Sequence, residues 1–466
     1  MSTNIRMEWN KLLNFNRRRQ SRMPDDHRAQ FERDYDRSIF STPVKRLQDK
    51  AQVFPLEPND AIRTRLTHSL EVAAVARGLA TNVAAWLYEK DEISYEQQRW
   101  VEAIAATCGL IHDLGNPPFG HAGEDAIRGW FVKRKSKIKK LLIEPQLCQD
   151  FLNFEGNAQT LRLVSKLQIL SDFNGLNLTF GTLSAACKYT AASHQTKNGS
   201  QALKKTGYFA SEVDVVKEVR KATGTGDARN PIAFLVEAAD DIVYSVADIE
   251  DAVKKGLLRW SDLKERFQSI IGDKSTHLAK PAMQSILMRK WEILGKPNED
   301  VQKLMADDTH GSAFRTAAIA YMVPEAVKAF QVNYDDIMLG KHKTELVEYS
   351  SLREIVKEFK TIGKEKVYPN KSTVKLELMG RKVIEDLMTF FLEGAQNMPL
   401  TGEPKAKDFK GRISTLLSRN YREVFQDSCR RGAQPEIYHR YQLVTDYVCG
   451  MTDTFAKQLH SDLMNG

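Results

Sequence analysis

The sequence contains 466 residues, of which 42% are hydrophobic and 27% charged, a composition that is typical of globular proteins and excludes a disordered or fibrous chain. No apolar run approaches the length of a membrane span, residues 1–6 lack a signal-peptide core, and the five cysteines show no CxxC spacing, so we expect a cytoplasmic protein with reduced thiols and no membrane contact. The net charge of +8 is a modest excess that a polyanionic partner could exploit.

Helical periodicity is common along the chain and strand signals are sparse, which predicts an all-α protein. We expect an N-terminal arm over residues 1–45, a helical catalytic core over 46–260, and an additional C-terminal helical region over 261–466. Amphipathic segments such as 374–392 and 438–460 indicate that the C-terminal region packs on the core. Glycine-rich and polar stretches at 193–207 and 224–230 predict loops.

Near the start of the predicted core, residues 63–72 open a helical pattern that contains His68. Thr67 is a candidate N-cap for this helix. Arg65 lies nearly one turn before His68 and would point a planar donor fork toward phosphate oxygens.

The next predicted helix ends in a His-Asp dipeptide. An apolar segment over residues 101–111 predicts a buried helix, and Gly115 fits the position just past its C-terminus. His112 and Asp113 stand at this end, where both side chains can reach one ion. Imidazole together with carboxylate suits a divalent transition metal or a manganese-like ion better than calcium.

A Pro-Pro turn follows, and after it His121 and Glu124 are spaced i, i+3. If a helix begins there, the two side chains lie within reach of each other. A carboxylate can orient an imidazole and favour its protonated form. The alternative is a histidine at a helix start with a capping glutamate.

An apolar helix is predicted to begin after Asn230, a good N-cap, with Pro231 in its first turn and Gly256 as its stop. One face of this helix carries Asp240, Tyr244 and Asp248 at i, i+4 and i+8. A carboxylate within so apolar a helix is costly to bury unpaired, and binding a cation is the readiest remedy. Core packing is the alternative for Tyr244.

Two basic clusters, residues 17–19 and 133–140, exceed the average charge density. Each is either a solvated surface or a nucleic-acid contact, and the sequence leaves both readings open.

The set His68, His112, Asp113 and Asp240 resembles the metal signature of the HD phosphohydrolase superfamily. More narrowly, the chain resembles the deoxyguanosine triphosphate triphosphohydrolases (dGTPases), because matching blocks follow in order through most of its length. These blocks are residues 46–57, 63–72, 112–124, 154–159, 188–190, 237–252 and 450–453.

The resemblance implies an HD-domain helical core that hydrolyses dGTP to deoxyguanosine and triphosphate with a divalent metal, Mg or Mn. It implies His68, His112, Asp113 and Asp240 as metal ligands, with Asp240 preferred over Asp241, and His121 with Glu124 as the residues that move protons. It assigns phosphate or sugar contacts to Gln52, Arg65, Asn157, Lys188, Tyr189, Tyr244 and Asp248. It also implies a homo-oligomer, a hexamer in the family, and single-stranded DNA as an activator in some members.

Two other hypotheses stay open. One is a different HD phosphohydrolase, acting on guanosine tetraphosphate or a cyclic nucleotide, although tetraphosphate hydrolases typically carry Glu-Asp after the His-Asp pair, whereas Gly115-Asn116-Pro117 follows here. The other is a nucleic-acid-binding regulator with a relic site, which the basic clusters suggest and the intact ligand set disfavours.

Overall fold

The protein is almost entirely helical. The computed structural model describes residues 6–20, 26–168, 172–272, 279–348 and 352–464, so residues 1–5 and 21–25 of the predicted arm lie outside the described parts. Within these parts the β structure is limited to two isolated bridges and a short parallel pair of strands, β1 (Ala191–Ala192) and β2 (Thr206–Tyr208). The all-α prediction is therefore confirmed. In the described parts of the chain, no helix is long and apolar enough to cross a membrane.

The helices of the first half, in chain order, are α1 (Trp9–Leu12), α2 (Gln30–Ile39), α3 (Thr42–Arg46), α4 (Arg65–Glu89), α5 (Tyr95–Ile111), α6 (Gly120–Val132), α7 (Lys135–Leu141), α8 (Pro145–Leu152), α9 (Gly156–Arg162), α10 (Phe180–Ala186), α11 (Val213–Thr223) and α12 (Pro231–Lys254). Short 3₁₀ or π-helical turns are η1 (Leu47–Asp49), η2 (Leu163–Leu167), η3 (Gln201–Leu203) and η4 (Ala210–Glu212).

The second half continues with α13 (Trp260–Gly272), α14 (Ala279–Ile293), α15 (Glu299–Leu304), α16 (Asp307–Val332), α17 (Tyr334–Met338), α18 (Leu352–Ile362), α19 (Lys371–Gln396), α20 (Phe409–Leu416), α21 (Arg419–Arg431), α22 (Glu436–Cys449) and α23 (Asp453–Met464). The turns between them are η5 (Leu346–Glu348) and η6 (Gly363–Val367).

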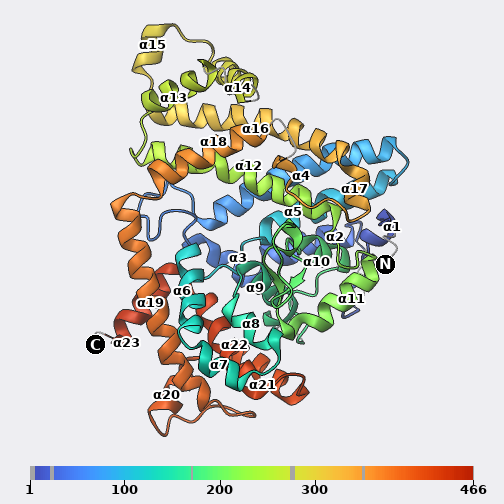
Figure 1. Ribbon diagram of the computed structural model, residues 1–466, viewed down its shortest axis with the longest axis vertical. Coiled ribbons are helices and arrows are strands. Elements are labelled where there is room, and N and C mark those ends of the chain that lie inside the picture. The colour runs from blue at the N-terminus through green and yellow to red at the C-terminus, as the bar shows by residue number, and fades with distance from the viewer. Residues whose placement is uncertain (1–5, 21–25, 169–171, 273–278, 349–351, 465–466) are drawn as a thin grey trace.

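Two hydrophobic cores organise these helices. The first joins α4, α5, α12, α14, α16 and α18 in the upper part of the view, and the second joins α6, α8, α9, α19, α21 and α22 in the lower part (Figure 1). α19 runs along one edge of the molecule and packs against α6 and α22. Both cores contain helices from before and after residue 260. The division of the chain into domains at this residue remains a prediction.

Local sequence explains how the two longest helices of the predicted catalytic core begin. Asn230 caps α12 as predicted, because its side chain accepts a hydrogen bond from the Ile232 amide at 2.9 Å. The predicted cap of α4 is wrong by one turn: Thr64, not Thr67, is the N-cap, and its hydroxyl accepts from the Thr67 amide. The helix therefore begins at Arg65 and includes it.

Gly115 is required for close packing rather than for ending α5. Its φ is not positive, so it is not the left-handed C-terminal glycine that the sequence predicts. A Cβ at this position would lie 2.2 Å from both the Gly156 carbonyl oxygen and the Thr160 nitrogen. Glycine thus lets the His-Asp turn lie directly against α9.

The junction of α22 and α23 ties two active-site segments together. The buried Asp453 carboxylate accepts hydrogen bonds from the amides of Ala51 at 3.0 Å and Phe119 at 2.9 Å. The buried Lys50 ammonium donates to the carbonyls of Asn116 at 2.6 Å and Cys449 at 2.8 Å. The C-terminal segment therefore fixes the loop after η1 and the turn before α6.

Candidate active site

Three predicted metal ligands meet at one point. Ligand atoms of His68 from α4, His112 at the end of α5 and Asp240 from α12 all lie within 4.8 Å of one another. Asp240 Oδ1 lies 3.3 Å from His68 Nε2 and 3.6 Å from His112 Nε2. The crossing of three long helices thus brings together residues that are far apart in the sequence.

The histidine nitrogens at this point have the chemistry of metal ligands. His112 Nδ1 lies 2.7 Å from the Gly109 carbonyl oxygen and donates to it, so its Nε2 carries a lone pair. Among the described residues, His112 Nε2 and both ring nitrogens of His68 are buried without a hydrogen-bond partner. Buried polar atoms that lack partners are costly, and an ion held by His68, His112 and Asp240 would satisfy His112 Nε2 and one nitrogen of His68.

Asp113 lies beside this group but is engaged by other partners. Its Oδ2 is 3.5 Å from His112 Nε2 and accepts a hydrogen bond from Arg65. Its Oδ1 accepts a hydrogen bond from Asn116 Nδ2 at 2.7 Å. Burial opposes ionisation, but the neighbouring His112 imidazole and the Arg65 guanidinium outweigh it and hold the pKa of Asp113 below its usual range. Asp113 as a metal ligand remains a prediction.

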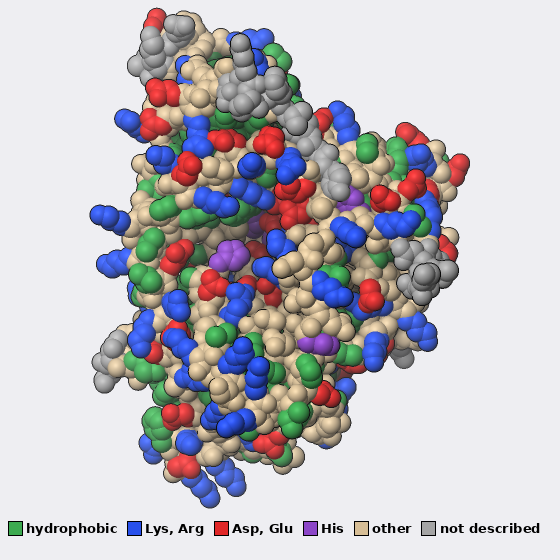
Figure 2. All heavy atoms as spheres, in the orientation of Figure 1, with side chains coloured by type: hydrophobic (Ala, Val, Ile, Leu, Met, Phe, Trp, Pro, Cys, Tyr) green, Lys and Arg blue, Asp and Glu red, His purple; other side chains and the backbone are tan. Residues whose placement is uncertain are grey.

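A cavity of about 500 Å³ opens from the group of His112 and Asp240 to the surface. Histidine, acidic and basic side chains gather around a hollow in the middle of the face that Figure 2 shows. The cavity wall carries Arg65, Lys188, Lys205 and Lys360 as its cationic side chains. Cationic side chains around a candidate metal site are suited to the negative charges of a phosphate chain.

Lys188 and Lys205 stand at the two ends of a loop, with Tyr189 beside Lys188. Lys188 Nζ lies 3.7 Å from Asp240 Oδ2, and Lys205 Nζ lies 3.1 Å from Glu155 Oε2. Burial opposes the charge of Lys188, but Glu237 and Asp240 outweigh it and raise its pKa. Burial also opposes the charge of Lys205, but Glu155 outweighs it and raises its pKa, so both lysines stay charged at neutral pH.

The predicted phosphate contacts Asn157 and Tyr189 also line this cavity. Asn157 Nδ2 donates to Glu155 Oε1 at 2.9 Å. Burial raises the pKa of Tyr189, which keeps its hydroxyl protonated and able to donate.

The predicted sugar contacts are joined by a tyrosine that the sequence did not indicate. Tyr244 lines the cavity and shares a hydrogen bond with the hydroxyl of Tyr368, which donates to Asp248 Oδ2 at 2.7 Å. Asp248 is only 4% exposed and stands behind Tyr368, whereas Gln52 lies in the cavity wall. Gln52 Oε1 is buried without a hydrogen-bond partner among the described residues.

His121 and Glu124 are not hydrogen-bonded to each other. Glu124 accepts from Arg128 and, at 3.4 Å, from the Gly156 amide, and burial together with Glu155 raises its pKa to about 7. The His121 ring stands in the cavity wall, where the surrounding protein and Arg65 lower its pKa. Both side chains line the cavity, and the proton-transfer role of this pair remains a prediction.

Sequence reasoning missed Lys205, Lys360 and Tyr368. Lys360 Nζ pairs with Asp241 at 2.7 Å, which gives Asp241 a partner other than a metal. Lys360 and Tyr368 follow α12 by more than a hundred residues, and neither belongs to a motif that links it to Asp240. A lysine and a tyrosine in amphipathic surroundings carry no sequence signal for a site.

Comparison with known proteins agrees with this geometry. A family model described as HD domain matches residues 65–156. The chain is 36% identical to a deoxyguanosinetriphosphate triphosphohydrolase-like protein of Listeria monocytogenes, over 98% of this chain and 99% of the relative. It is 33% identical to a protein of the same description from Synechocystis sp., over the same shares. It is 31% identical to a deoxyguanosinetriphosphate triphosphohydrolase of Klebsiella pneumoniae, over 93% of each chain. The family expected from the motifs is confirmed, and the chain belongs to the deoxyguanosinetriphosphate triphosphohydrolase family.

Proposed function

We propose that this protein is a metal-dependent dNTP triphosphohydrolase that converts dGTP and water to deoxyguanosine and inorganic triphosphate. The observation that carries the proposal is the group of His68, His112 and Asp240 at one end of a cavity with cationic walls. The family relationship supports the same reaction, since the Klebsiella pneumoniae relative is named for it. A divalent ion, when bound, would polarise the α-phosphate and lower the pKa of a bound water.

The residues of the chain divide the remaining work. Arg65, Lys188 and Lys205 offset the negative charge of the triphosphate, since their ammonium and guanidinium groups line the same cavity. His121 and Glu124 manage the proton that leaves the attacking water and the one that reaches the departing 5′-oxygen. Tyr244 and Tyr368, joined through their hydroxyls, bound the part of the cavity that holds the sugar. An aromatic side chain close to C2′ leaves no room for a ribose hydroxyl.

Product analysis tests the reaction. The purified protein is incubated with each of the four dNTPs and with GTP, in Mg²⁺ or Mn²⁺, and the products are separated by chromatography. We expect deoxyguanosine and free triphosphate, with dGTP preferred over GTP. Pyrophosphate or a nucleoside monophosphate as the product would support a different HD phosphohydrolase, and equal use of GTP and dGTP would refute the deoxyribonucleotide assignment.

Two results together would instead favour a nucleic-acid-binding regulator. The wild type would show no detectable hydrolysis, and salt-sensitive binding of single-stranded DNA would persist in His112→Ala. The first basic cluster does not favour that reading. Arg17 is buried and pairs with Asp34 at 2.5 Å, and Arg18 pairs with Glu218 at 2.8 Å. The second cluster keeps exposed lysines on α7.

A further inference from the structure

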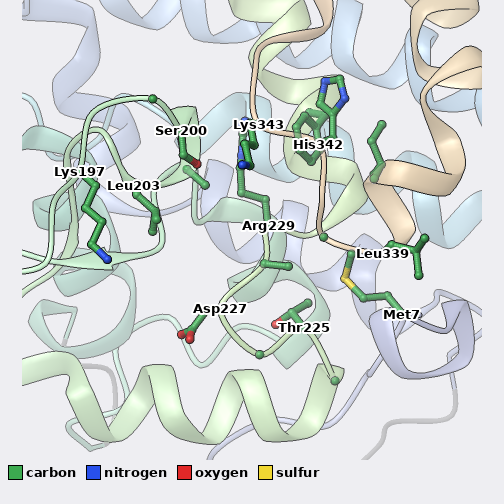
Figure 3. A pocket seen from close by; sticks show the side chains of 18 of the residues that line it. Met7, Lys197, Ser200, Leu203, Thr225, Asp227, Arg229, Leu339, His342 and Lys343 are labelled. Carbon is green, nitrogen blue, oxygen red and sulfur yellow. The ribbon is translucent and has the colours of Figure 1, made fainter. Parts of the chain in front are cut away.

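We propose that a second cavity, separate from the metal cluster, binds the phosphate monoester of an apolar or aromatic molecule and thereby weakens substrate binding. This cavity has a volume of about 670 Å³ and lies among the loops 197–203, 224–229 and 339–343. Figure 3 shows Arg229 in the middle of the cavity, Lys343 and His342 above it, and Lys197 and Leu203 to one side. Its volume falls in the range of small-molecule sites, roughly 300–1,000 Å³.

Arg229 lacks hydrogen-bond acceptors that its burial demands. The residue is 3% exposed, and its Nη2 pairs with Glu237 Oε2 at 2.7 Å. Among the described residues, its Nε and Nη1 are buried without a partner. The guanidinium also lies over the ring of Phe234, with 4.2 Å from Cζ to the ring centroid. Because unpaired buried donors are costly, an anion that enters the cavity and reaches this guanidinium would be stabilised.

The rim of the cavity adds positive charge. Lys197 and Lys343 are exposed, and neither ammonium has an ion pair or hydrogen bond within the described residues. The acidic residue at the rim, Asp227, is already paired with Arg220 at 2.6 Å. The cavity thus has three cations, Arg229, Lys197 and Lys343. The nearby carboxylates of Asp227 and Glu237 are both ion-paired, and this balance favours a doubly charged phosphate.

The rest of the lining is largely apolar. Met7, Phe234 and Ile337 are each buried and line the cavity, and Leu203 and Leu339 are half-buried there. A lining that combines cationic and apolar side chains fits an organic phosphate with an apolar or aromatic body better than inorganic phosphate.

The cavity is connected to the active site through α12. Glu237, which pairs with Arg229, lies one turn before Asp240, and its Oε1 is 3.8 Å from Lys188 Nζ. Gln201, in the loop that walls the cavity, donates to Glu237 Oε1 at 3.1 Å, and its backbone amide donates to the Lys343 carbonyl at 2.8 Å. That loop ends at Lys205, which lines the active-site cavity.

An anion bound at Nε and Nη1 of Arg229 repels Glu237, which pairs with Nη2 of the same guanidinium. Glu237 then pairs more strongly with Lys188 and holds this ammonium away from the triphosphate, so the KM for the nucleotide rises. This effect on KM rests on the proposed function, whereas binding to the cavity does not.

Calorimetric titration of the full chain with phenyl phosphate tests the site without any nucleotide. Two further titrations serve as controls: inorganic phosphate supplies the phosphate group alone, and phenol supplies the aromatic ring alone. The test variant is Lys197→Glu/Lys343→Glu, and the matched control is Lys139→Glu/Lys140→Glu, which makes the same charge change at exposed lysines of α7. A second variant, Ser200→Trp, fills the cavity at a side chain that makes no hydrogen bond in the described structure.

We expect saturable binding of phenyl phosphate to the wild type and the control, with phosphate or phenol alone binding more weakly. In the test variant we expect binding to weaken by more than about tenfold, because like charges then face the ligand. Ser200→Trp should abolish it. Equal binding in all four proteins, or no saturable binding to the wild type, would overturn the site. A KM for dGTP that phenyl phosphate leaves unchanged in an active wild type would overturn the coupling alone.

Discussion

At the scale of single residues, the candidate metal site of His68, His112 and Asp240 depends on which histidine nitrogens have no hydrogen-bond partner within the described residues. His112 Nδ1 is held by the Gly109 carbonyl, so it is Nε2, 3.6 Å from Asp240 Oδ1, that remains to bind an ion at the end of α5. Burial opposes the charge of Asp240, but His112, His68 and Lys188 outweigh it and lower its pKa. The carboxylate is therefore ionised and ready to bind a cation at neutral pH.

Asp240→Ala should fold but lose the tightly bound divalent ion and all turnover, because the site loses its central negative ligand. The neighbouring change Asp241→Asn is the matched control, since Asp241 pairs with Lys360 and lies outside the ligand group. Elemental analysis of the purified proteins decides the matter. Unchanged metal content in Asp240→Ala would remove this residue from the ligand set.

The pH dependence of kcat/KM should report Glu124. Burial and Glu155 raise the pKa of this carboxyl to about 7, so it is protonated below that pH and ionised above it. Because only the ionised form can accept a proton, kcat/KM should increase as pH rises through about 7. Glu124→Gln should lose this rise and reduce the rate by about 10²-fold or more.

Profiles of both proteins from acid to mildly alkaline pH, with metal content measured alongside, check this expectation. The nucleotide titrates equally in both experiments. A rise that persists unchanged in Glu124→Gln would therefore exclude Glu124 as its origin.

At the scale of elements, long helices position the ligands, and short backbone contacts fix the turns between them. The face of α12 that carries Asp240 and Tyr244 could be predicted, because helical spacing is a local property. Tyr368 could not, because its hydrogen bond to Asp248 spans 120 positions and no periodicity records such a pairing. The hydrogen-bond partner of Glu124 was likewise not foreseen: it is Arg128, one turn further along α6.

Asp453→Asn should lower kcat/KM about tenfold while the metal stays bound, because an amide NH₂ then faces one of the two backbone donors, Ala51 or Phe119. The change loosens the loop that carries Gln52 and the start of α6, not the ligands. Asp49→Asn is the control, since Asp49 also joins this region to α23, through Thr454 at 2.7 Å. A variant that matches the wild type in kcat/KM would show that the clamp does not position the site.

Replacing either of two glycines by alanine should change the free energy of unfolding in opposite directions. Gly115→Ala places a Cβ against α9 and should lower the free energy of unfolding by about 1–3 kcal/mol or more. Gly78→Ala, within α4, has nothing within 4 Å of the added Cβ and should raise it by about 0.5–1 kcal/mol. Urea titrations of the two variants and the wild type measure both. Destabilisation by both changes, or by neither, would contradict this reading of the contacts.

At the scale of the whole molecule, the helical class followed from periodicity, but the arrangement of the two cores did not. Residues 374–392 were predicted as an amphipathic helix, and α19 occupies them, but its packing against α6 has no signature in either segment alone. The loop predicted over 193–207 also holds a short parallel strand pair with the segment 191–192. Pairings of this kind depend on which distant segments meet.

The chain after residue 260 should be necessary for the catalytic half to fold, and this can be tested with a chain that ends there. α12 packs against α16 and α18 as well as against α4 and α5. Glu250 on α12, with a side chain only 2% exposed, pairs with Arg315 and accepts from Ser312 of α16 at 2.8 and 2.7 Å. Exposing a large apolar side chain costs about 1.5–3 kcal/mol, and a whole domain is stable by only about 5–15 kcal/mol, so a few such exposures suffice.

We therefore expect the chain 1–260 to lose cooperative thermal unfolding and to bind no metal, whereas the full chain shows a single sharp transition. Circular dichroism followed through heating, with elemental analysis of the same samples, compares the two. The sign of the result is informative in either direction, because a sharp transition and retained metal in the shorter chain would mean that residues 46–260 form an independent domain on which the remaining helices only dock.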